Sequence, residues 1–262
     1  MEAVGLELYK QGFPWGLVSN GLSLDRSRLD SLLKAGLHSI TISLDGFKEA
    51  HNWLRQHPQS YDKALDAIKM LTKEKEIVWD VVTCANQKNI NQLGDFKESL
   101  IDIGVKDWRI FSIFPAGRGA SIPELRLSDK EFTQVLDFIS ATRKEKRINL
   151  NFGCEGFLGN YEMEVRDYFF QCNAGVNTAS VLADGSISGC TSIRANFHQG
   201  NIYKDNFADV WENHFLPFRN RKWSRKDICA DCSLFRYCEG NGMHLYDDNG
   251  NLLVCHYNRI IS

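Results

Sequence analysis

Seven of the eight cysteines in this 262-residue chain lie between residues 154 and 255, at short spacings. Four of them form the series Cys229-x2-Cys232-x5-Cys238-x16-Cys255. Two thiolates that are two residues apart can turn toward one metal centre from a single tight loop, and two further thiolates can complete a tetrahedral shell. We therefore expect the C-terminal part of the chain to be built around metal rather than around a hydrophobic core.

A second group of cysteines precedes this series. It follows the pattern Cys172-x12-Gly185-x4-Cys190, and Cys154 lies upstream of it as either a further ligand or a bystander. Four thiolates suit zinc as well as an iron–sulfur cluster, so the spacing alone leaves the metal open. The remaining cysteine, Cys84, lies in an apolar stretch and is predicted to be a buried structural thiol.

The composition is that of an ordinary globular protein, with 43% hydrophobic and 24% charged residues. The formal net charge of −2 gives no reason to expect a nucleic acid or an anionic membrane as a partner. No stretch approaches the roughly 18 apolar residues of a membrane span, and the first residues lack the features of a signal peptide. We expect a cytoplasmic protein whose cysteines are reduced thiols or metal ligands rather than disulfides.

The first part of the chain alternates strand-like and helix-like patterns. Strands are predicted over 15–19, 39–45, 77–85 and 108–114, and helices over 25–35, 60–76, 91–103 and 128–144. Four such alternations predict an α/β fold in which parallel strands are joined by right-handed crossovers. Ligands should bind at the carboxyl ends of the strands. The periodicity does not distinguish a barrel from an open sheet.

The character of the sequence changes near residue 149. Helical periodicity fades while glycines and cysteines become frequent, and Asp184-Gly185 is a hairpin signal between two short strand patterns. One more helix is expected over 207–215. We therefore predict two domains, 1–150 and 151–262.

Taken together, the cysteines resemble the SPASM-type C-terminal domain of the radical S-adenosylmethionine (SAM) superfamily. That domain follows the pattern C-x9-15-G-x4-C, a gap, C-x2-C-x5-C-x3-C, a gap, and C, and it usually holds two auxiliary [4Fe–4S] clusters. The resemblance favours iron–sulfur over zinc. It implies a complete second cluster, and a first cluster on Cys172 and Cys190 with Cys154 as a third ligand. The ligands of the second cluster would be Cys229, Cys232, Cys238 and Cys255.

One position departs from this pattern. The last cysteine of C-x5-C-x3-C, which in the family reaches back to the first auxiliary cluster, falls on Gly242. Three cysteines would leave one iron open for substrate or for a donor other than cysteine. His244 is a conceivable fourth ligand, although a lone histidine is more often an ordinary structural residue. In some relatives an acidic base follows the second cysteine of the first cluster, but Thr191 stands there and no base can be carried over.

The resemblance extends to the first half of the chain. Asn20-Gly21, Ser43-Leu44-Asp45-Gly46 and the segment 115–119 resemble the strand-end motifs that surround SAM in the superfamily. Arg109 is either a cofactor contact or a structural arginine inside the barrel. The candidate cofactor-binding residues are Asn20, Ser43, Asp45, Arg109 and Gly117.

A C-x3-C-x2-C motif, which binds the radical-generating cluster in the superfamily, does not occur in these residues. On this comparison the chain begins about two β/α units late, and the strand at 15–19 would be left with an unpaired edge. We therefore expect a partial barrel, from an enzyme whose first segment precedes these residues. The chain alone is predicted not to generate radicals.

The resemblance implies a protein that modifies a peptide or protein with SAM-derived radicals and takes electrons from a flavodoxin or ferredoxin. One alternative is a non-catalytic, degenerate module that binds a peptide or relays electrons. Another is a zinc-stabilised structural domain without a redox role.

Overall fold

The computed structural model describes residues 1–261, which divide into two compact units. The first unit consists of Met1–Ile113 and Gln134–Gly153, and the second consists of Phe114–Thr133 and the chain from Cys154 onward. The second unit thus includes a segment that precedes the last strand of the first unit. The predicted domain boundary at residue 150 stays a prediction.

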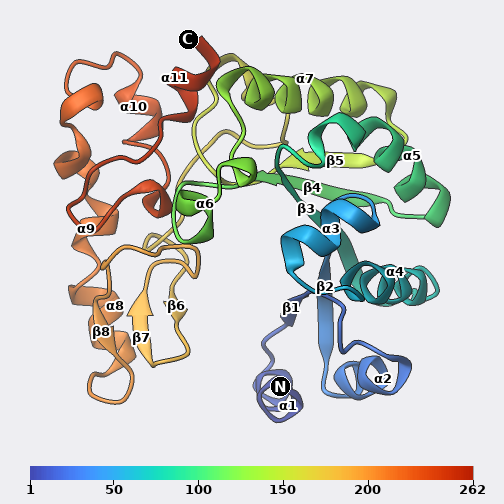
Figure 1. The fold of residues 1–262 in the computed structure, drawn as a ribbon. Coiled ribbons are helices and arrows are strands. Elements are labelled where there is room, and N and C mark those ends of the chain that lie inside the picture. Colours follow the sequence, from blue (N-terminus) through green and yellow to red (C-terminus); the bar gives the residue numbers. More distant parts are fainter. Residues whose placement is uncertain (262) are drawn as a thin grey trace. The chain divides into compact units, whose positions relative to one another are not determined.

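The first unit is built on a five-stranded, fully parallel sheet in the order β1-β2-β3-β4-β5 (Figure 1). Its strands are β1 (Trp15–Ser19), β2 (Leu37–Ser43), β3 (Val78–Ala85), β4 (Asp107–Ser112) and β5 (Asn149–Phe152). The α/β class is confirmed, and each predicted strand lies within two residues of its expected bounds. Among the described residues β1 pairs only with β2, so it is an edge strand.

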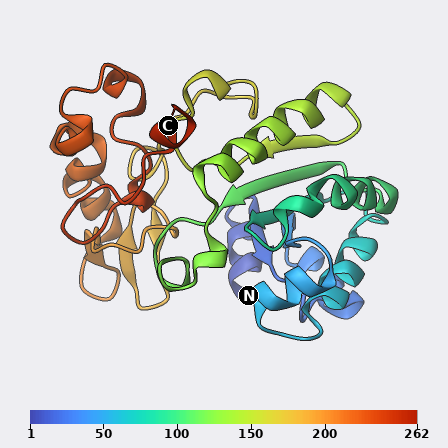
Figure 2. The same cartoon turned by 45° about the horizontal axis from the view of Figure 1, so that its top comes forward.

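Helices connect these strands, as Figures 1 and 2 show. They are α1 (Glu2–Lys10), α2 (Arg26–Lys34), α3 (Lys48–Arg55), α4 (Ser60–Leu71), α5 (Leu93–Ile103) and α7 (Asp129–Glu145), with a 3-10 turn at Ile90–Gln92 before α5. Helix α4 ends five residues before the predicted end. The backbone there tightens to i→i−3 bonds, and the Thr72 hydroxyl donates to the Lys69 carbonyl, which competes with continued α-helix.

The two faces of the sheet differ in chemistry because successive side chains of a strand point to opposite sides. One face is apolar and buried, and Trp108 of β4 lies on it with no exposed surface. The Trp108 ring contacts Phe96 and Phe138 edge-on, at centroid distances of 5.7 and 6.0 Å, and its Nε1 donates to Thr83 Oγ1 at 2.8 Å. Burial of this face supplies the main hydrophobic stabilisation of the unit.

The opposite face of the sheet is polar and half-buried. It carries Thr41, Asp80, Cys84, Arg109 and Asn151 in alternate strand positions. Cys84 is only partly buried, so the prediction of a buried thiol is wrong in that respect. The sequence around it is apolar, but the register of β3 turns its side chain toward the polar face.

A buried carboxylate fixes the chain where β2 ends. Asp45 has no exposed surface, and its Oδ2 accepts from Arg55 Nε at 2.6 Å while its Oδ1 accepts from the Cys84 amide at 2.9 Å. His51 Nδ1 accepts from the Asp45 amide at 2.9 Å, and Asn89 Nδ2 donates to the Asp45 carbonyl at the same distance. Burial acts to raise the pKa of Asp45, but the contacts with His51, Arg55 and the Cys84 amide outweigh it and hold that pKa below its ordinary value.

The second unit has short elements. They are the helices α6 (Arg118–Ser121), α8 (Phe207–Asn213), α9 (Leu216–Arg219), α10 (Phe235–Cys238) and α11 (His256–Ile261), the antiparallel strands β6 (Ser180–Val181), β7 (Ser186–Ser188) and β8 (Gly200–Asn201), and 3-10 turns at Pro123–Leu125, Gly159–Tyr161, Arg221–Ser224, Asp227–Cys229 and Met243–Leu245. The predicted hairpin forms between β6 and β7, where Gly185 adopts a φ of 84°. The helix expected over 207–215 is α8.

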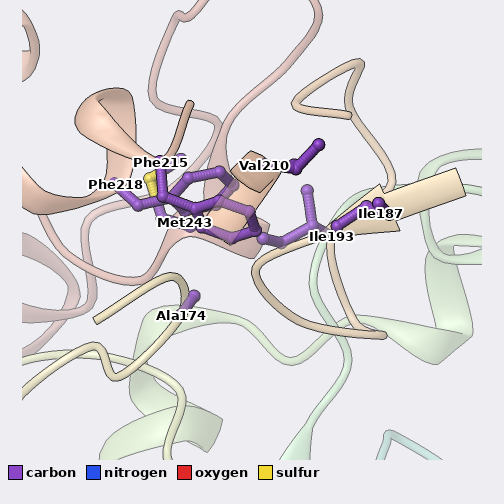
Figure 3. Close-up of a cluster of buried hydrophobic side chains, with 7 residues drawn as sticks. All are labelled: Ala174, Ile187, Ile193, Val210, Phe215, Phe218 and Met243. Carbon is purple, nitrogen blue, oxygen red and sulfur yellow. The ribbon is translucent and has the colours of Figure 1, made fainter. Parts of the chain in front are cut away.

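A compact apolar cluster lies inside this unit (Figure 3). Phe215 and Phe218 stack at a centroid distance of 5.2 Å within it. Its buried members are Ala174, Ile187, Ile193, Val210, Phe215, Phe218 and Met243. The expectation of a unit built around metal instead of a hydrophobic core was thus too strong, because a small core is present beside the cysteines. No helix within residues 1–261 has the combined length and apolar character that crossing a membrane requires.

We predict that Asp45→Asn lowers the free energy of unfolding by about 3 kcal/mol at pH 7, because it leaves Arg55 beside a neutral amide in a buried site. The folded-state pKa of Asp45 is depressed, so its stabilising effect is complete above the ordinary value of about 3.9 and is lost as the pH falls through the folded-state pKa. Chemical denaturation at several pH values should therefore show the difference from wild type narrowing in acid. Asp62→Asn is the matched control, since its ion pair with Lys48 is solvent-exposed and should contribute less than about 1 kcal/mol. A loss at Asp45 no larger than that at Asp62 would contradict the assignment.

Candidate metal centres

Four cysteines from separate turns meet in the second unit. Cys229 ends the 3-10 turn Asp227–Cys229, Cys238 ends α10, and Cys255 immediately precedes α11, while Cys232 lies in the turn between the first two. Each of the six pairs within this set interacts electrostatically. The structure therefore brings together the four residues predicted as one ligand set.

The electrostatic environment of these four thiols disfavours their ionisation unless a metal cation is bound. Burial raises the pKa of Cys229 to about 11, and the neighbouring thiols Cys238, Cys255 and Cys232 add to the effect. Burial also raises the pKa of Cys238 and Cys255, against the opposing effect of backbone N–H donors. Those donors come from residues 240 and 241 for Cys238, and from residues 257 and 258 for Cys255. Four thiolates in one place repel each other, so a metal centre is what makes their ionisation favourable.

The other three C-terminal cysteines form a second neighbourhood. Cys172 and Cys190 both pack against the apolar cluster of Figure 3. Cys154 interacts electrostatically with both. The residue is exposed to solvent, but protein atoms around its sulfur raise its pKa by desolvation, and Glu155, Cys190 and Cys172 raise it further. The structure thus brings Cys154 to this set.

Backbone amides donate to sulfur in this neighbourhood too. The amide of Ser192 lies 3.4 Å from Cys190 Sγ, and the amide of Met243 lies 3.4 Å from Cys172 Sγ. N–H···S hydrogen bonds are one of the means by which proteins tune cluster sulfurs. All eight cysteines lie in the described part of the chain, and none of them forms a disulfide.

The donor types fit an iron–sulfur cluster. Both neighbourhoods offer soft thiolate ligands with N–H donors to sulfur, which suits either [4Fe–4S] or zinc. Within residues 1–261, no group of three or more His, Cys, Asp or Glu side chains is drawn close enough around one point to hold a single metal ion. The thiols therefore share a common environment without forming a closed mononuclear shell.

Three of the cofactor-binding candidates of the first unit, Asn20, Ser43 and Asp45, lie near the carboxyl ends of its strands. Asn20 directly follows β1 and is exposed, and its Oδ1 accepts from the Leu22 amide at 3.1 Å. Ser43 is the last residue of β2 and is buried. Because parallel strands end at a common edge, Asn20 and Ser43 share that edge. Gly117, with a φ of 55°, belongs to the second unit.

Asp45 and Arg109 are engaged inside the first unit. Arg109 pairs with Asp80 and donates to Thr41 Oγ1 at 3.0 Å. It lines a cavity of about 380 Å³ formed by residues of β2, β3, β4 and β5, away from the edge where SAM was expected. These contacts match the structural alternative for Arg109, and its role as a cofactor contact stays a prediction, as does that of Asp45.

Asn86 and Asn89 also shape this edge, although neither is among the site residues predicted from the sequence. Asn89 Oδ1 accepts from the Asn86 amide and its Nδ2 donates to the Cys84 carbonyl, both at 2.9 Å. Both asparagines are fully buried. Two asparagines three residues apart after a predicted strand are a usable signal for such a turn.

Comparison with known proteins identifies the family. The Radical SAM superfamily pattern matches residues 1–100, and the SPASM pattern, described as an iron–sulfur cluster-binding domain, matches residues 172–233. The second match includes Cys172, Cys190, Cys229 and Cys232, and it decides for iron–sulfur over zinc. The chain is thus an iron–sulfur protein of the α/β class. It belongs to the radical SAM superfamily and carries a SPASM domain, which implies iron–sulfur clusters and SAM as cofactors.

The chain is similar to an AdoMet-dependent heme synthase of Methanosarcina barkeri, with 24% identity over 255 residues that cover 90% of this chain and 71% of the relative. It is also similar to the mycofactocin maturase MftC of Mycolicibacterium smegmatis, with 24% identity over 234 residues that cover 86% of this chain and 57% of the relative. Among solved structures, anSMEcpe with bound AdoMet and Kp18Cys peptide superposes with a TM-score of 0.68 at 18% identity, covering 95% of this chain and 72% of that one. This structural likeness concerns the fold.

We predict that Cys232→Ala removes about four irons per chain after anaerobic reconstitution, because it breaks a four-thiol set. It should also destabilise the second unit, since metal binding contributes to folding. Cys84→Ala is the matched control and should leave the iron content unchanged, because Cys84 lies in the first unit. Iron and sulfide analysis with thermal unfolding checks both. Iron lost from the Cys84 variant but kept in the Cys232 variant would contradict the ligand assignment.

Proposed function

We propose that this chain is the cluster-bearing part of a cytoplasmic enzyme that modifies a peptide or protein by SAM-derived radical chemistry. The observation that carries the proposal is the four-thiol set at Cys229, Cys232, Cys238 and Cys255, with every pair interacting, in a chain of the radical SAM/SPASM family. When bound, iron–sulfur clusters accept or donate single electrons or hold a substrate at an open iron.

The chain's own residues would have distinct roles in this function. The four-thiol set would hold one auxiliary cluster, and Cys154, Cys172 and Cys190 would hold another. The edge beside Asn20 and Ser43 would receive SAM, on a scaffold kept rigid by the buried carboxylate of Asp45. A flavodoxin or ferredoxin would supply electrons.

The choice of a peptide as substrate has two supports. One relative is a mycofactocin maturase, and the superposed anSMEcpe structure contains a bound peptide. A tetrapyrrole is the second candidate, because another relative with similar identity and higher coverage is a heme synthase. The two candidates predict different binding affinities, for a peptide or for heme, and both affinities can be measured on this chain.

We expect the reconstituted chain to bind peptides encoded by short reading frames beside its gene, and not to bind heme. Fluorescence anisotropy of labelled peptides and the absorbance spectrum of added heme measure the two affinities on the same preparation. The Cys232→Ala variant serves as a control for dependence on the cluster domain. Tight heme binding with no peptide binding would overturn the peptide proposal and favour the tetrapyrrole.

We further predict that the reconstituted 262-residue chain, given SAM and dithionite, produces no 5′-deoxyadenosine above the background without protein. The physical reason is that its sequence holds no C-x3-C-x2-C motif to present an iron to SAM. Chromatographic detection of 5′-deoxyadenosine checks this. Substantial formation would show that another cluster of this chain cleaves SAM, and would contradict the assignment of both cysteine sets as auxiliary.

A further inference from the structure

Gly242 stands where the family pattern places a cysteine, and its surroundings leave no room for a side chain. Its backbone is extended, with φ −71° and ψ 140°, so any residue type could adopt it. A Cβ atom at Gly242 would lie 2.6 Å from Cε1 and 2.9 Å from Nδ1 of His244. Both distances are shorter than a Cβ atom can approach another heavy atom without a clash. The imidazole of His244 therefore occupies the space into which a side chain at position 242 would project.

That space adjoins the first cysteine set. The next residue, Met243, donates its amide to Cys172 Sγ at 3.4 Å. On another side, the Glu155 carbonyl oxygen lies 2.9 Å from the same Cβ position, and Glu155 directly follows Cys154. His244 thus follows the residue whose amide donates to Cys172, and its ring lies beside the same Cβ position as the carbonyl of Glu155, the residue after Cys154.

The local structure fixes this ring and leaves its nitrogens available. The 3-10 turn Met243–Leu245 folds His244 back over Gly242, and Phe114 contacts the ring edge-on at a centroid distance of 5.1 Å. Within residues 1–261, neither ring nitrogen of His244 has a hydrogen-bond partner. A neutral imidazole has one nitrogen lone pair that can bind metal.

From this geometry we propose that His244 supplies the fourth ligand of the first auxiliary cluster, in place of the cysteine that Gly242 cannot provide. This inference rests on the proposed function, in which Cys154, Cys172 and Cys190 hold that cluster. Coordination needs no redox step, because a neutral imidazole donates a lone pair and releases no proton. One imidazole in place of a thiolate makes the site less negative, which raises the reduction potential of the cluster.

One other buried histidine of this unit is a rival. Both ring nitrogens of His256 are buried without a hydrogen-bond partner, and Nε2 lies 3.7 Å from Glu155 Oε2. His256, however, directly follows Cys255 of the other ligand set, and its ring packs edge-on against Phe132 at 5.1 Å. The Gly242 site is occupied by His244 and not by His256.

The decisive experiment is pulsed electron paramagnetic resonance on the reconstituted, reduced full chain. A histidine-ligated cluster shows nitrogen hyperfine coupling of the size typical of a directly bound imidazole, which an all-cysteine cluster lacks. We expect this coupling in wild type together with about eight irons per chain. We expect it to be absent in His244→Ala and retained in His198→Ala, whose histidine is exposed on the same unit.

Chemical rescue tests the ligand role apart from folding. Adding ¹⁵N-imidazole to His244→Ala should restore the coupling with a ¹⁵N signature, because the free imidazole fills the vacated position. The midpoint potential of the first cluster should also be higher after this addition than in His244→Ala without imidazole. A merely structural role for His244 would give neither change.

Three results would overturn the proposal. One is coupling that persists in His244→Ala but disappears in His256→Ala, and another is a first cluster that shows no nitrogen coupling in wild type. The third is a wild-type chain with only about four irons, all lost in Cys232→Ala, since no first cluster would then exist. This last result would leave the peptide-binding proposal standing, because that is tested by affinity.

Discussion

The cost of ionising closely placed, partly buried thiols is the constraint on which the second unit depends. Four sulfurs approach from separate turns, and the pKa of Cys229 rises to about 11 because burial opposes its ionisation and the neighbouring thiols add to the effect. Backbone amides offset a part of this cost at Cys238 and Cys255. A cationic metal centre is needed to offset the rest of the cost of ionising these thiols. Since the helices here are short and the apolar cluster is small, metal loading and folding of this unit should be coupled.

In the first unit, charges are compensated by other protein side chains and not by a metal centre. Its buried or half-buried charges are neutralised by partners within the unit: Asp45 by Arg55, and Arg109 by Asp80. The charges of such a sheet are paired without a ligand, and its carboxyl edge keeps short polar side chains such as Ser43. The two units thus combine a preformed scaffold with a region that metal completes.

Much of the α/β part could be predicted from the sequence, because runs of β-branched residues and glycine stops mark its strands. Helix α3 was missed, since it is eight residues long and its N-cap, Phe47, forms no side-chain cap. Strand β5 has only four residues and no distinct pattern. The error at Cys84 is instructive, because the alternation with Asp80 and Val82 already placed it on the polar face. The grouping of thiols far apart in sequence came from family resemblance, since spacing cannot say which distant turns meet.

The crowding at Gly242 has a consequence for how such sequences can vary. A side chain there and the His244 ring exclude each other sterically, although the backbone would accept either arrangement. The Glu155 carbonyl oxygen also lies 2.9 Å from that Cβ position, so a cysteine at the first position would need a shift of this backbone as well as a smaller residue at the second. In relatives, glycine at the first position should accompany histidine at the second, and the ligand type would behave as one inherited character.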